Sequence, residues 1–136
     1  MKTVRIASLA SIAAAATAGI AGAAEILVSG DIVTSTTWTK DNTYNLQGQV
    51  YVRPGATLTI QAGTVVASAT GGSLAVSRDA RLVCIGTPTE PVIFTSKNDV
   101  NTWTNGDPKT GTWRAVANEW GNVTICGRGY IGKYGQ

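Results

Sequence analysis

One stretch of this sequence returns 24 residues later, and that repeat limits the possible folds more than any other feature. The residues VRPGATLTIQAGTVV begin at Val52, and the residues VSRDARLVCIGTPTE begin at Val76. The matched pairs are Val52 with Val76, Ala56 with Ala80, Leu58 with Leu82, and Ile60 with Cys84. Sequence periods in this range are typical of architectures that stack one structural repeat on the next.

Each copy of the repeat predicts short strands separated by turns. Apolar and β-branched residues alternate with polar ones, and Pro54-Gly55 is a turn signal. Helical repeats lack support because no segment has a sustained 3.6-residue apolar period, and the leucine ladder of leucine-rich repeats is absent. We therefore predict an all-β chain wound as a parallel β-helix, a solenoid whose laps lie about 4.8 Å apart. Alternation predicts that Ala56, Leu58, Ile60, Ala80, Leu82 and Cys84 point inward.

Two further segments extend the winding on either side of the repeat. Residues 91–96, PVIFTS, predict a second strand of the same lap, with Val92 and either Phe94 or Ile93 pointing inward. Residues 30–52 predict the first lap or a capping strand.

The last part of the chain predicts a loop followed by another strand. Residues 97–112 are polar and rich in turn formers, so we expect a loop that leaves the wall of the solenoid. Residues 120–131 have the strand pattern again, with Val123 and Ile125 as the inward pair.

The first 24 residues predict a secretory signal peptide. Lys2 and Arg5 precede an uncharged run, and the small residues AGAA permit cleavage after Ala23 or Ala24. That run is 15 residues long (6–20), whereas a spanning helix needs about 20, so an uncleaved anchor is the weaker alternative. We expect one domain over residues 25–136, exported by the general secretory route and without a stable membrane span after cleavage.

Composition excludes several functional classes. Without Lys2 and Arg5 the chain has nine basic and eight acidic residues and no basic run, which disfavours nucleic acid as a partner. The chain contains no histidine, so a histidine-based triad or a histidine-ligated zinc site is excluded. No phosphate-binding glycine loop is present either. We expect no cofactor.

The two cysteines permit a disulfide but do not require one. An exported chain could join Cys84 to Cys126. Alternation puts Cys84 inside the wall, whereas Cys126 follows the inward Ile125 and should face outward, which argues against the bond. The alternative is two free thiols.

Acidic residues offer only weak candidates for catalysis or metal binding. Glycoside chemistry needs two carboxylates, or a calcium-bound carboxylate with a basic residue, on one outer face. Asp79 lies between Arg78 and Arg81, and Asp107 and Glu119 are distant possible partners. The Asn- and Asp-rich segment 98–107 could bind calcium, but it lacks EF-hand spacing, and such residues are expected in any turn.

Aromatic residues suggest a binding surface, since indole faces suit stacking on sugars or peptides. We predict Trp38 and Trp103 as ligand-binding residues. Trp113 and Trp120 are better explained as sealing the wall beneath the loop.

Three strings resemble the N-terminal region of a family of secreted bacterial β-helix proteins, most of them functionally uncharacterised. These strings are RPGATLTIQAGTVVAS (53–68), GSLAVSRDARLVCIGTPTEPVIFTS (72–96) and DPKTGTWRAVANEWGNVTICGRGYI (107–131). The resemblance implies a right-handed parallel β-helix, with only its N-terminal laps present, and export. It contains no catalytic motif and so implies no activity.

These observations predict an exported structural or binding module of a cell-surface or extracellular protein, without catalysis of its own. Glycans or other cell-surface components are the expected partners. We expect the module to be a shortened product or the front of a longer protein, whose open last lap self-associates. The alternative is the non-catalytic front end of a carbohydrate-active β-helix enzyme: a polysaccharide lyase, an epimerase or a glycosidase.

Overall fold

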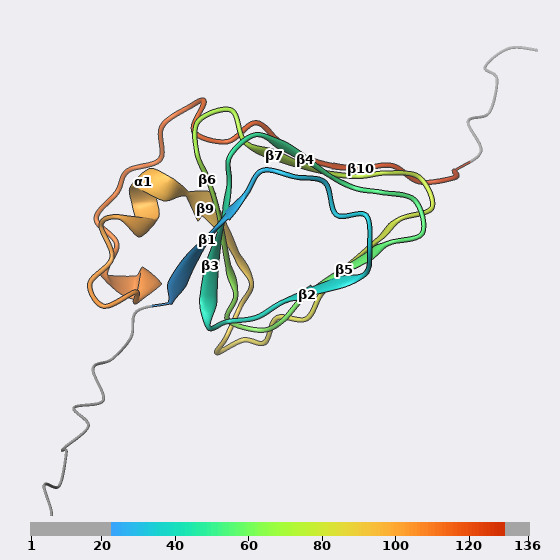
Figure 1. Cartoon of the computed structure of the whole chain (residues 1–136). Coiled ribbons are helices and arrows are strands. Elements are labelled where there is room, and N and C mark those ends of the chain that lie inside the picture. Colours follow the sequence, from blue (N-terminus) through green and yellow to red (C-terminus); the bar gives the residue numbers. More distant parts are fainter. Residues whose placement is uncertain (1–22, 130–136) are drawn as a thin grey trace, which may run out of the picture.

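A computed structural model describes residues 23–129 of the chain, and they form a short solenoid of β-strands (Figure 1). The strands are β1 (Ala24–Val28), β2 (Thr36–Trp38), β3 (Asn42–Leu46), β4 (Gln49–Val52), β5 (Thr57–Ile60), β6 (Val65–Ser68), β7 (Ser73–Val76), β8 (Arg81–Cys84), β9 (Ile93–Ser96) and β10 (Val123–Ile125). A short helix α1 (Lys97–Val100) and a 3-10 turn η1 (Pro108–Thr110) lie between β9 and β10.

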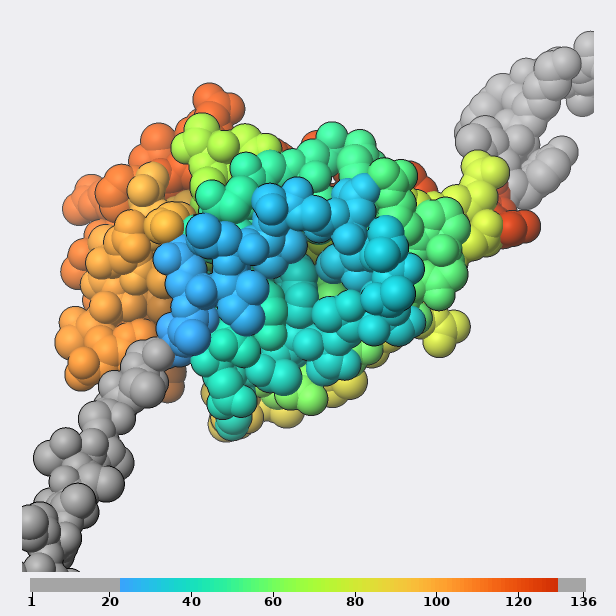
Figure 2. All heavy atoms as spheres, in the orientation of Figure 1, coloured from blue at the N-terminus to red at the C-terminus, as the bar shows by residue number. Residues whose placement is uncertain are grey.

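Three parallel sheets form the walls of the solenoid. Sheet A has the order β1-β3-β6-β9, sheet B the order β10-β7-β4, and sheet C the order β2-β5-β8. In Figure 1 the chain passes clockwise from β4 to β5 to β6, and Figure 2 shows the N-terminal lap nearest the viewer. Because the chain turns clockwise as it recedes, the solenoid is right-handed, the hand that parallel crossovers almost always take. The predicted parallel β-helix is confirmed.

Strand register confirms the 24-residue repeat in two of the three sheets. Val52 pairs with Val76 in sheet B, and Leu58 pairs with Leu82 in sheet C. In sheet A the offset is 22 residues between β3 and β6 and 28 between β6 and β9. The difference arises at the corners, which absorb extra residues while the strands stay in register.

Turn chemistry explains why the corner between sheets B and C repeats so faithfully. In residues 53–56, Pro54 fixes φ for the first central position of a turn, and Gly55 has a φ of 85°. In residues 77–80 the equivalent position is Asp79, with a φ of 67°, a conformation that Asp tolerates better than most residues. In both turns the fourth N–H donates to the first carbonyl at 3.0 Å, and the Gly55 N–H donates to the Asp79 carbonyl at 2.9 Å. Equivalent corners therefore stack directly.

The core lies inside the triangle that the three sheets enclose. There the inward side chains of successive laps form ladders. Leu58 and Ile60 are completely buried and Ala56 nearly so, as the alternation predicted. The other buried apolar residues of the cluster are Ile32, Trp38, Tyr44, Leu46, Val50, Val52, Val66, Leu74 and Val76. Stacking of similar residues removes their apolar surface from water, and this burial stabilises the fold by about 25 cal/mol for each Å².

The ladders of inward side chains end at the last lap, where their apolar residues are exposed to solvent. Phe94, rather than Ile93, continues the inward ladder, since it pairs with the buried Val66, yet it is 38% exposed. Val123 and Ile125 pair with the buried Leu74 and Val76 but are 44% and 66% exposed.

Cys84 corrects one detail of the predicted core. It pairs with Ile60 as expected, but its side chain is exposed, because no described residue lies over it.

Residues 30–52 form the first lap, and β1 adds a partial lap before it on sheet A. Polar side chains accept from backbone groups at this end of the other two sheets. The Asp31 carboxylate accepts from the Tyr51 N–H of the edge strand β4 at 3.0 Å, and the Ser35 hydroxyl accepts from the Thr57 N–H at the start of β5 at 3.1 Å. Exposed strand edges invite pairing with other chains, and the Asp31 contact protects the edge of sheet B.

The polar segment 97–112 does leave the wall, and it also contains α1 and η1. Ser96 caps α1 by accepting from the Asp99 N–H at 3.1 Å, and Asp107 caps η1 by accepting from the Lys109 N–H at 2.9 Å. Helix α1 contacts β6 and β9, so the loop covers part of the outer face of sheet A (Figure 1).

Most of the predicted signal peptide, residues 1–22, lies outside the described residues, as do residues 130–136. Within 23–129, no helix has the length and hydropathy needed to cross a membrane.

Candidate functional site

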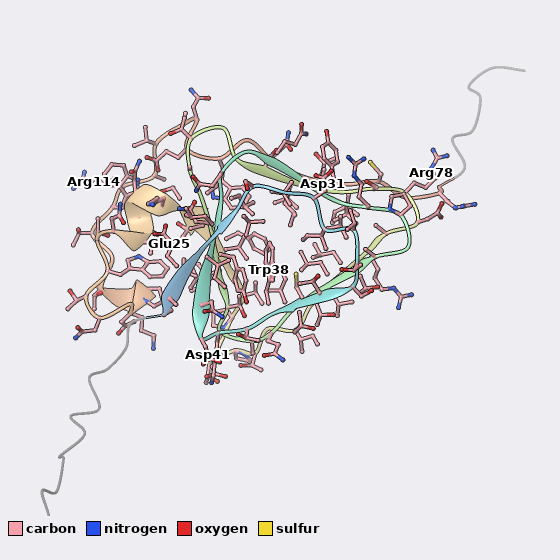
Figure 3. The ribbon with its side chains drawn as sticks, in the orientation of Figure 1. Glu25, Asp31, Trp38, Asp41, Arg78 and Arg114 are labelled. Carbon is pink, nitrogen blue, oxygen red and sulfur yellow. The ribbon has the colours of Figure 1, made fainter. Side chains whose placement is uncertain are left out.

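Trp38 does not belong to a binding surface, which corrects the prediction made from the sequence. It ends β2, points into the solenoid (Figure 3), and is 4% exposed. Its ring stacks on Tyr44 with centroids 4.5 Å apart, and the Tyr44 hydroxyl accepts from the Thr39 N–H at 3.1 Å. Both aromatic residues belong to the core of the first lap, where a ligand could not reach them.

Trp103 lies in the loop, as expected, with its ring held in one orientation. The indole Nε1 donates to Asp99 Oδ1 at 3.1 Å. Gly111 lies against the same edge of the ring, since a Cβ there would stand 2.9 Å from Nε1. The side chain is half-buried, and its ring lines a pocket of about 380 Å³ between the loop and the outer face of sheet A.

We name this pocket the outer trough. Its floor is the outward ladder Thr43, Val65 and Ile93, one residue from each lap of sheet A. Trp103 lies in the wall that the loop contributes, together with Asp107 and Lys109. The trough thus runs across successive laps and has both apolar and charged lining.

An ion pair forms the wall of the trough opposite the loop. Lys40 Nζ donates to Glu90 Oε1 at 2.9 Å, joining the first lap to the third. Gly63 lies between them in the second lap, where a Cβ would be 3.5 Å from the Lys40 Cβ and 3.7 Å from the Glu90 Cβ. A Cβ would make ordinary contacts at these distances, so glycine is favoured here by its φ of 75°. The hydrogen bond from Lys40 to Glu90 raises the pKa of the Lys40 ammonium.

A second pocket, of about 280 Å³, lies on the other side of α1, and we name it the tryptophan pocket. Trp113, Trp120, Asp99 and Glu119 contribute to its lining. Trp120 behaves as predicted: it is half-buried, donates through Nε1 to the Thr95 carbonyl, and packs edge-on against Phe94 with centroids 6.0 Å apart. Trp113 does not seal the wall in the same way, since it is 41% exposed.

Glu119 is held as an ionised carboxylate by neutral donors. Asn98 Nδ2 donates to Oε1 at 2.7 Å, and Trp113 Nε1 donates to Oε2 at 2.8 Å. These hydrogen bonds, that of Asn98 first, lower the pKa of the Glu119 carboxyl. Since Asp107 lines the outer trough instead, the structure does not bring Asp107 and Glu119 together.

The remaining charged candidates have structural roles. Arg128 donates to both oxygens of Asp79, from Nε at 2.5 Å and from Nη2 at 2.6 Å. This interaction lowers the pKa of Asp79 and ties one corner of the solenoid to the next. In the part of the chain that the structure describes, no three acidic or sulfur-bearing side chains gather as metal ligands.

Both cysteines are free and exposed in the structure, which is the arrangement given above as the alternative to a disulfide. Cys84 ends β8 on sheet C, and Cys126 follows β10 on sheet B. Partial burial raises the pKa of the Cys84 thiol.

The sequence did not predict the Lys40–Glu90 ion pair, nor the pocket that Asp99 and Glu119 line together. The repeat could have indicated the Lys40–Glu90 pair, because the two residues lie at the same corner of the solenoid, one lap before and one lap after Gly63. No periodic signal marks the second, because it forms inside the loop inserted between β9 and β10.

Comparison with known families agrees with this architecture. Residues 30–136 match the family model described as a pectate-lyase like beta helix domain. Searches with the chain found no significant match among curated proteins or solved structures.

Proposed function

Because the chain belongs to the pectate-lyase-like β-helix domain family, we propose that it is an exported module that binds a glycan in the outer trough and does not cleave it. The observation that carries the proposal is the position of Trp103. Its indole ring lines a pocket that crosses several laps of the solenoid.

The chemistry of the trough supports a sugar more than a purely apolar ligand. An indole face packs well on the C–H face of a pyranose, and charged groups at a pocket rim hydrogen-bond hydroxyls. Here Trp103 supplies the face, while Lys40, Glu90 and Lys109 supply donors and acceptors around it. The ring is already oriented by Asp99 and Gly111, so binding would not have to order it.

Binding without cleavage is supported by the state of the acidic residues. A glycosidase needs a carboxyl with a raised pKa as general acid beside a second carboxylate. The two carboxylates that line the trough already have structural partners, since Glu90 is paired with Lys40 and Asp107 caps η1.

Glycan-array binding by the full chain and by Trp103→Ala tests this proposal. We expect the wild type to bind a defined set of polysaccharides and Trp103→Ala to bind at least fivefold more weakly, as for loss of one anchoring aromatic residue. Trp113→Ala is the matched control, since it removes an indole outside the trough, and it should bind as the wild type does. Equal binding by all three proteins would refute the proposal.

Export is the second half of the proposal, and β1 suggests where processing occurs. The Ala24 N–H donates to the Asp41 carbonyl at 3.2 Å, and Ala24 pairs with Asn42. Cleavage after Ala23 keeps this pair, whereas cleavage after Ala24 removes it. We expect the N-terminal sequence of protein recovered outside the cytoplasm to begin AEILV; an intact Met1 terminus would contradict export.

The family description favours one alternative, a domain that itself cleaves a polysaccharide. Incubation of the full chain with polygalacturonate distinguishes the two. Release of unsaturated oligosaccharides would replace the non-catalytic proposal, and binding without release would support it.

A further inference from the structure

We propose that the tryptophan pocket binds an organic ammonium cation. The pocket, of about 280 Å³, is separate from the outer trough and has a different lining. It contains two indoles and two carboxylates, and no lysine or arginine among residues 23–129 lines it. The inference does not depend on glycan binding in the trough.

The groups that donate hydrogen bonds to the two carboxylates are all neutral in the described residues. Asp99 accepts from the Thr95 hydroxyl at 2.7 Å and from Trp103 Nε1 at 3.1 Å. Glu119 accepts from the Asn98 amide and from Trp113 Nε1. Four ion pairs occur in the described residues, and none of them includes Asp99 or Glu119.

The nearest basic residues in the sequence are directed elsewhere. Lys97 Nζ is paired with Glu25 Oε1 at 2.8 Å, on the other side of α1. Arg114 lies on the outer side of the loop, beyond α1 (Figure 3), and does not line the pocket. The negative charge inside the pocket therefore remains available to a ligand.

The two indole rings favour an organic cation over a metal ion as the ligand. A hard metal ion needs six to eight oxygen ligands, and among residues 23–129 no cluster of three candidate ligands exists. An alkylammonium group instead gains from the faces of aromatic rings together with a nearby negative charge. Trp113, which is 41% exposed and fixed by its hydrogen bond to Glu119, and the half-buried Trp120 supply such rings.

Calorimetric titration with choline, beside its neutral isostere 3,3-dimethylbutan-1-ol, tests the proposal. The full chain should bind choline, and the neutral alcohol should bind at least tenfold more weakly, because only the charge differs. Equal affinity for the two probes, or no heat with choline, would overturn the proposal.

Variants locate the site. Glu119→Gln should weaken choline binding at least fivefold, and Trp113→Leu by a similar factor. Glu90→Gln is the matched control, since it removes the same charge from the outer trough, and it should leave the affinity unchanged. A similar loss in Glu119→Gln and Glu90→Gln would show general attraction to an acidic surface and would overturn the assignment. Circular dichroism of each variant checks that the fold is retained.

Discussion

Individual residues act in this solenoid mainly by fitting between laps. Asn45 is completely buried on sheet A, where its Nδ2 donates to Glu25 Oε1 at 2.7 Å, and the same oxygen accepts from Lys97 Nζ. Three elements, β1, β3 and α1, therefore meet at one carboxylate. Hydrogen bonds from Lys97 first, and from Asn45, lower the pKa of Glu25.

Gly72 provides a test at the scale of a single residue. A Cβ at this position would lie 2.7 Å from the Leu46 carbonyl of the neighbouring lap and would also collide with the Ser68 hydroxyl. Since the backbone cannot move without disturbing the ladder, Gly72→Ala should destabilise the fold by about 2 kcal/mol.

Gly48→Ala is the control for this change, because nothing lies within 4 Å of the Cβ it adds. The urea midpoint should fall for Gly72→Ala and change little for Gly48→Ala. Equal midpoints for the two variants would contradict the close approach between laps.

At the scale of elements, the first edge of sheet B is protected by charge. Asp31 accepts from the Tyr51 N–H and from Arg53 Nε, at 3.0 and 2.8 Å. These interactions, the backbone hydrogen bond first, lower the pKa of Asp31 in the folded state. A group with a lowered pKa stabilises the fold above its unfolded pKa, and the stabilisation is lost as the pH falls through the folded value.

Thermal unfolding as a function of pH tests this edge. Asp31→Asn should melt at a lower temperature than the wild type at pH 7, because it loses the charge that faces Arg53. The difference should persist down to about pH 4 and shrink below it, where the wild-type carboxyl becomes protonated. A difference independent of pH would assign the effect to shape rather than to charge.

The strands and corners of the repeat and the position of the loop could be predicted from the sequence, but not the structure inside the loop. The alternation around Leu58 and Leu82 encodes both the strand and the face that is buried, and register keeps one above the other. Residues 97–112 carry no periodicity, so neither α1 nor the pockets beside it could be found. The prediction for Trp38 was wrong because the run of threonines before it does not show the apolar alternation expected of the short strand β2.

At the scale of the whole molecule, the two ends of the solenoid differ. Asp31 and Ser35 occupy backbone donors at the first end, whereas the described part of the last lap leaves Phe94, Val123 and Ile125 exposed above the core. Unpaired strand edges beside apolar side chains favour pairing with a second copy. We therefore expect the chain to self-associate through this end.

Size-exclusion chromatography with light scattering tests that expectation. The wild type should contain dimers or larger species, and Ile125→Lys should shift the distribution towards monomer. Val33→Lys is the control. Val33 is also exposed, at 68%, but it lies between β1 and β2, at the opposite end of the solenoid. A wild type that is monomeric at every concentration would refute self-association through the last lap.

The insertion between β9 and β10 leaves the pairing of the strands on either side of it unchanged. Val76 and Ile125 remain paired although 49 positions separate them, while Val52 and Val76 are 24 apart. The solenoid thus accommodates about two dozen additional residues between β9 and β10, and the strand that follows still stacks in register. Both pockets proposed to bind ligands lie beside this insertion, so we expect substitutions within it to change ligand binding while the strand pairing is kept.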